Sequence, residues 1–114
     1  MRILVHGVSL FFGSKVTEAA RHTRADVVFC QASSPLAREV ERTRPAMVIL
    51  ELEKADLAQL AELKARKDLP GVKVVGFASH VNEAVLESAR QAGCDEVYSK
   101  GEFTRRLEDL LSDD

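Results

Sequence analysis

The chain has 114 residues, the length of one domain, and its 46% hydrophobic and 30% charged residues are typical of a globular protein. Sixteen Lys and Arg against eighteen Asp and Glu leave a formal charge of −2, so no basic surplus exists for binding nucleic acid or an anionic membrane. No apolar stretch approaches the roughly 20 residues of a transmembrane helix. We therefore expect one cytoplasmic domain over residues 1–114 that binds neither nucleic acid nor membrane.

Short apolar runs rich in β-branched residues alternate with helical segments along the whole chain. The runs predict strands over Ile3–Val8, Asp26–Cys30, Met47–Leu52, Lys73–Ala78 and Glu96–Ser99. The third and fourth runs are almost continuously apolar, which is typical of strands covered on both faces of a parallel sheet. Five βα units with right-handed crossovers predict an α/β fold, a three-layer sandwich with helices on both faces of a five-stranded parallel sheet.

The segments between the strands carry helix signals at their ends. Ser34 followed by Pro35 predicts an N-cap with proline at the first helical position. Asp56 with Gln59 three residues later predicts a capping box, and Gly93 is typical of the glycine that follows a helix.

The two cysteines, Cys30 and Cys94, are too few and too far apart for a redox motif or a zinc site. We expect both to be reduced. The first turn, from His6 to Gly13, has neither a P-loop nor a three-glycine dinucleotide pattern. We therefore expect no cofactor.

Three segments carry a resemblance to a known family. Arg2-Ile3-Leu4-Val5 opens the chain, Arg44–Leu52 is similar to Pro-Asp-Leu-Val-Leu-Leu-Asp-Leu, and Ala92–Lys100 is similar to Ala-Gly-Ala-Asp-Asp-Tyr-Leu-x-Lys. In these segments the chain resembles the receiver domain of bacterial two-component response regulators, over essentially its whole length. The resemblance implies a flavodoxin-like (CheY-like) fold with strand order 2-1-3-4-5.

In that family an aspartate ending the third strand accepts a phosphoryl group, and an acidic pair after the first strand holds magnesium. The acceptor position falls on Glu51, and the acidic pair falls on Gly7 and Val8, or on His6 and Gly7 if the register shifts by one. None of these three is a hard oxygen ligand for magnesium. The extra methylene of Glu51 also displaces its carboxylate from the geometry that phosphoryl transfer requires.

The family's remaining functional positions are also changed. The hydroxyl position falls on Ala78, with Ser79 expected to point elsewhere, and the switch aromatic falls on Val97, with Tyr98 on the opposite face. Only Lys100 matches. The resemblance thus implies a degenerate phosphorylation pocket, a pseudo-receiver without catalytic residues or metal.

Two interpretations of Glu51 remain open. It forms an ion pair with Lys100 that mimics the phosphorylated state, or it is a solvated residue at the strand end, where an ion pair contributes under about 1 kcal/mol. Phe11 and Phe12 cannot both face inward on one helix, so one of them is a candidate partner contact.

Two classes of function follow. The first is a phosphorylation-independent signalling module that binds other proteins or a second copy of itself. We expect the binding surface on the fourth helix, fifth strand and fifth helix. The candidate interface residues are Leu86, Val97, Tyr98, Arg105 and Arg106. The alternative is a small flavodoxin-like ligand-binding domain or enzyme whose strand-end cleft holds His6, Glu51, His80 and Lys100. We favour the first, a non-enzyme, because no nucleophile with a base and no phosphate loop can be named.

Overall fold

Five strands and five helices alternate along the part of the chain that the computed structural model describes, residues 1–69 and 71–112. In chain order they are β1 Arg2–His6, α1 Leu10–Ala20, β2 Asp26–Cys30, α2 Leu36–Thr43, β3 Met47–Glu51, α3 Leu57–Ala65, β4 Lys73–Ala78, α4 Glu83–Ala92, β5 Glu96–Ser99 and α5 Lys100–Ser112. The predicted limits of 1–114 also include Pro70, Asp113 and Asp114, which lie outside the described residues.

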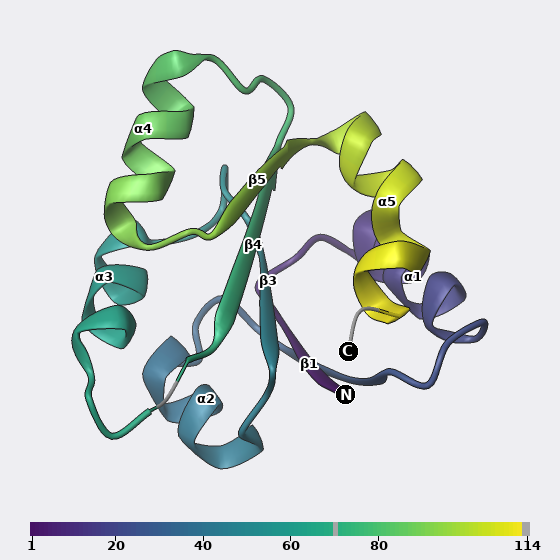
Figure 1. The fold of residues 1–114 in the computed structure, drawn as a ribbon, viewed down its shortest axis with the longest axis horizontal. Coiled ribbons are helices and arrows are strands. Elements are labelled where there is room, and N and C mark those ends of the chain that lie inside the picture. The colour runs from purple at the N-terminus through teal and green to yellow at the C-terminus, as the bar shows by residue number, and fades with distance from the viewer. Residues whose placement is uncertain (70, 113–114) are drawn as a thin grey trace.

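All strand pairs are parallel, and the sheet order is β2-β1-β3-β4-β5. This confirms the fold class and the order expected from the sequence. Helices α1 and α5 cover one face of the sheet, and α2, α3 and α4 cover the other (Figure 1).

Alternation along the strands divides the apolar residues between the two faces. Ile3 and Val5 of β1 face the α1/α5 side, while Leu4 faces the α2/α3/α4 side. On the α1/α5 side, Phe77 stacks on Phe103 at a ring-centroid distance of 4.2 Å and lies 5.0 Å from Phe12. These three rings join one strand to both helices of that layer.

Strand β1 ends at His6, two residues before the predicted end at Val8, because Gly7 turns the chain with φ +67°. Strand β3 ends at Glu51, one residue before the predicted end. The Leu52 N–H nevertheless still donates to the Phe77 carbonyl at 2.9 Å.

The predicted helix caps are partly correct. The prediction of Ser34 as an N-cap is wrong, because Pro35 is the N-cap of α2. The Leu36 N–H at the start of this helix donates to the Gln59 side chain. Asp56 caps α3 by accepting from the Ala58 N–H at 3.0 Å, but Gln59 does not complete a capping box because its side chain reaches α2. Gly93 ends α4 with φ +123°, as expected.

Both cysteines are free thiols, as predicted. No helix in residues 1–69 and 71–112 has the length and apolar character needed to cross a membrane.

Candidate functional site

Glu51, the last residue of β3, lies at the carboxyl edge of the sheet with only 4% of its surface exposed. The interpretation of Glu51 as a solvated residue is therefore wrong. Its Oε1 atom accepts a hydrogen bond from the Ser9 backbone N–H at 3.0 Å. Ser9 is the N-cap of α1 and makes no side-chain cap bond, so Glu51 ties the start of α1 to the end of β3.

The Lys100 ammonium forms ion pairs with two carboxylates. Its Nζ atom lies 3.8 Å from Oε2 of Glu51 and 3.1 Å from Oε1 of Glu53. The same ammonium lies 5.3 Å from the centroid of the Phe12 ring, a cation–π distance. The expected pairing of Glu51 with Lys100 is thus present, but Glu53 is the nearer partner.

Ser79 takes part in this cluster, contrary to the expectation that it points elsewhere. Hydrogen bonds from the Ser79 hydroxyl and from Lys100 hold the pKa of Glu53 below its usual range. Ala78, at the family's hydroxyl position, is buried at the end of β4 and supplies no polar atom. The strand alternation used to place Ser79 stops at Ala78, where β4 ends, and so does not apply to the loop.

Gly7 and Val8, at the two positions expected for the acidic pair, are closely packed against their neighbours. A Cβ atom at Gly7 would lie 2.8 Å from the Cβ of Ala32, and the positive φ would strain any larger residue. Val8 is half-buried and packs against the core on the α1/α5 side. This loop is built for close packing rather than for acidic side chains.

Magnesium, which the resemblance implies for the family, does not fit these residues. It requires oxygen ligands in near-octahedral geometry, and positions 7 and 8 offer none from side chains. The Glu51 carboxylate is committed to Ser9 and Lys100. Residues 1–69 and 71–112 contain no group of three or more His, Cys, Asp or Glu side chains arranged to hold a metal ion.

The four residues of the alternative ligand cleft differ in burial and in their contacts. His6 is buried, and its Nε2 atom lies 2.6 Å from the Ser34 carbonyl oxygen. His80 is exposed in the loop after β4. The small cavity of about 40 Å³ beside His6 is lined by neither Glu51, His80 nor Lys100.

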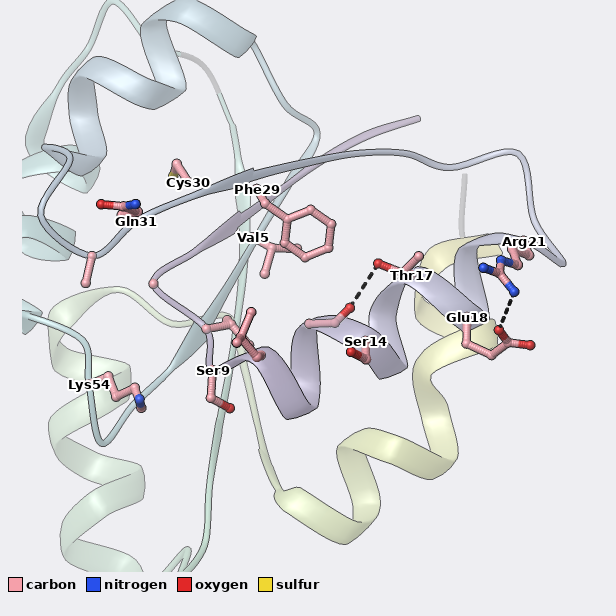
Figure 2. A pocket seen from close by; sticks show the side chains of 15 residues that line it. Val5, Ser9, Ser14, Thr17, Glu18, Arg21, Phe29, Cys30, Gln31 and Lys54 are labelled. Carbon is pink, nitrogen blue, oxygen red and sulfur yellow. Dashed lines mark hydrogen bonds and ion pairs between the residues drawn. The ribbon is translucent and has the colours of Figure 1, made fainter.

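A groove of about 810 Å³ lies elsewhere, between α1 and β2. Figure 2 shows the Phe29 ring pointing from β2 toward α1, with Lys54 at one end of the groove and Arg21 at the other. The sequence reasoning missed this groove. The sequence does contain a pattern that could have indicated an exposed apolar surface here. Strand β2 is an edge strand that stays apolar at every position after Asp26 instead of alternating with polar residues.

The five candidate interface residues come from α4, β5 and α5, with Val97 and Tyr98 packed against opposite faces of the sheet. Tyr98 is half-buried, donates a hydrogen bond to Glu96 at 2.6 Å and lies 5.7 Å from the Arg106 guanidinium. Arg105 and Arg106 both pair with Glu102. The remaining two, Leu86 and Val97, are half-buried.

The comparisons with known proteins concern the whole domain. No protein-family model matches the sequence, and no curated protein matches it either. Solved structures do match it. The response regulator receiver domain from Bermanella marisrubri superposes with a TM-score of 0.80 at 19% identity, over 96% of this chain and 93% of that one. A receiver domain of a DNA-binding response regulator from Colwellia psychrerythraea 34H gives 0.80 at 12% identity, over 97% and 98%. The chain has the receiver fold.

Other structures with the receiver fold include the Mn(2+)-bound form of the response regulator Rcp1 and the phosphorylated cyanobacterial phytochrome response regulator RcpA. They are 20% and 18% identical to this chain, with TM-scores of 0.76 and 0.78, over 96% of this chain in both cases and over 90% and 89% of theirs. At such identities the likeness shows the receiver fold alone. Whether this receiver-fold chain takes a metal or a phosphoryl group depends on its own residues.

Proposed function

We propose that this chain is a pseudo-receiver, a non-enzymatic signalling module that takes no phosphoryl group and acts in the cytoplasm by binding proteins. The observation that supports this most is the state of Glu51, whose buried carboxylate already accepts the Ser9 N–H. A carboxylate engaged in this way is not a free nucleophile. The two free thiols agree with a reducing compartment.

The surroundings of Glu51 also support the proposal. Phosphoryl transfer depends on positioning and on a metal that neutralises the developing charge. Gly7 and Val8 supply no metal ligand, and Ala78 supplies no hydroxyl. Lys100 is held by Glu51 and Glu53, so its charge has partners without a phosphoryl group.

The first prediction tests this directly. Incubation with acetyl phosphate and magnesium should leave the intact mass of the protein unchanged, because both the acceptor and its metal ligands are replaced. The measurement is intact-protein mass spectrometry, with a receiver domain that carries the full acidic set labelled in parallel as a control. A stoichiometric gain of one phosphoryl group that disappears in Glu51→Gln would show that the site is active.

For protein partners we propose the face formed by α4, β5 and α5. It combines the Tyr98 ring, two arginines and the half-buried Leu86, a composition that interface hot spots favour. On this proposal the double variant Tyr98→Ala/Arg106→Glu binds its partner more weakly while its circular dichroism spectrum stays unchanged.

A further inference from the structure

Strand β2 is an open edge of the sheet. Within residues 1–69 and 71–112 its one partner strand is β1, in a register that joins Asp26 to Arg2 and Cys30 to His6. The Asp26 N–H donates to the Met1 carbonyl at 2.8 Å, and the Cys30 carbonyl accepts from the Gly7 N–H at 2.9 Å. Backbone groups of alternate residues point to opposite sides of a strand. The backbone N–H and C=O groups of Asp26, Val28 and Cys30 therefore point toward β1.

The backbone N–H and C=O groups of Val27 and Phe29 consequently point away from the sheet. Edge strands that stay single are usually protected by lysine, proline, a bulge or a very short length. Strand β2 has five residues, and its one charge, Asp26, is paired with Arg2 at 3.0 Å. The opposite edge, β5, has four residues and carries Glu96, whose carboxylate lies 2.7 Å from Lys73. Of these two edges, β2 is the longer and the more apolar.

Two exposed apolar side chains lie beside this same edge. In residues 1–69 and 71–112 the large hydrophobic residues exposed to solvent are Leu10 at 91%, Phe11 at 64% and Phe29 at 48%. Leu10 and Phe29 both line the groove between α1 and β2. The Phe29 ring lies close to α1: a Cβ at Gly13 would be 3.5 Å from it, an ordinary van der Waals contact.

We propose that β2 pairs with β2 of a second copy of this chain, antiparallel, so that the two sheets join into one. The sequence of β2 is complementary to itself in this antiparallel arrangement. With a two-fold axis at Val28, Val27 lies opposite Phe29 of the second copy, and both free N–H and C=O groups of each residue are satisfied. An axis at Val27 or at Phe29 would leave part of these groups unpaired.

The side chains agree with this register. Val27 and Phe29 both face the α1 side, where Val27 packs against the core and Phe29 lines the groove. The dimer therefore makes two aromatic to β-branched cross-strand pairs, a favourable combination. A two-fold axis perpendicular to the sheet keeps both α1 helices on one face, so the two grooves open toward each other.

Charge does not oppose the pairing. The formal charge of −2 per chain gives weak repulsion between copies. In this register Asp26 lies opposite the uncharged Cys30 of the second copy, so no like charges meet. The inference adds a partner to the proposed function but does not depend on whether Glu51 is phosphorylated.

The register is tested by cross-linking. Asp26 and Cys30 of the second copy form a non-hydrogen-bonded pair with a Cα separation of about 4.5 Å, within disulfide range. Asp26 is exposed, so Asp26→Cys should fold normally. Burial raises the pKa of the Cys30 thiol to about 11, so an added oxidant is required. We expect a covalent dimer from Asp26→Cys and none from Asp26→Cys/Cys30→Ser.

The surface is tested by sedimentation over a concentration series. Phe29→Lys should weaken self-association at least about tenfold because it places a charge in the joined grooves. Tyr98→Ala/Arg106→Glu should leave it unchanged. A wild-type chain that stays monomeric and yields no cross-link, or a dimer that survives Phe29→Lys but is lost in the double variant, overturns the proposal. These outcomes leave the phosphodonor experiment unaffected.

Discussion

At the scale of single residues, Glu51 has a structural role. Its carboxylate is buried and accepts the Ser9 N–H at the start of α1. The spacing of the sequence placed Glu51 at the end of the third strand, but it did not reveal the bond to Ser9, because that contact spans 42 positions. Glu53 differs: its side chain remains 45% exposed.

Glu51→Ala should lower the free energy of unfolding by about 1–3 kcal/mol, because it leaves the partly buried Ser9 N–H without an acceptor. Glu51→Gln keeps an acceptor oxygen and should lose less. Urea unfolding measures both, with Glu53→Ala as the control on an exposed carboxylate. Equal losses from Glu51→Ala and Glu53→Ala would contradict a structural role for Glu51.

At the scale of elements, α4 is the helix with the fewest buried residues. Its one fully buried residue is Ala89, whereas α3 buries Leu60 and Leu63. The Asn82 side chain caps α4 by accepting from the Val85 N–H at 2.9 Å. The start of α3 at Asp56 and the end of α4 at Gly93 were predicted from the sequence because caps are local. How deeply each helix is buried depends on the rest of the fold.

Asn82→Ala should cost about 1 kcal/mol through loss of the cap. Because α4 has little buried surface, the change should appear as faster amide hydrogen exchange across Glu83–Ala92, with little effect on the sheet. Asp56→Ala removes the corresponding cap of α3 and is the matched control. Exchange that rises equally in all helices after Asn82→Ala would show that α4 does not open separately.

At the scale of the whole molecule, Phe77 joins the sheet to the layer formed by α1 and α5. It is fully buried in β4 and lies between Phe12 of α1 and Phe103 of α5. Phe77→Ala should lower the free energy of unfolding by about 3–5 kcal/mol, a large part of the stability of a small domain. Leu10→Ala, at a residue 91% exposed, should change it by less than about 0.5 kcal/mol at dilute concentration. Guanidinium unfolding measures both, and similar losses would contradict the assigned core.

The sequence by itself determined the parallel α/β architecture, because strand runs, helix periodicity and caps are set by neighbours along the chain. The resemblance of the sequence to receiver domains also predicts that Gly7, Val8 and Glu51 stand at the functional positions of that family, and this stays a prediction. Only the tertiary structure decided that Glu51 binds the Ser9 N–H and that Phe29 stays exposed beside a groove. Both depend on contacts between distant segments and on how far α1 covers the edge strand, which the pattern of residues along the chain does not encode.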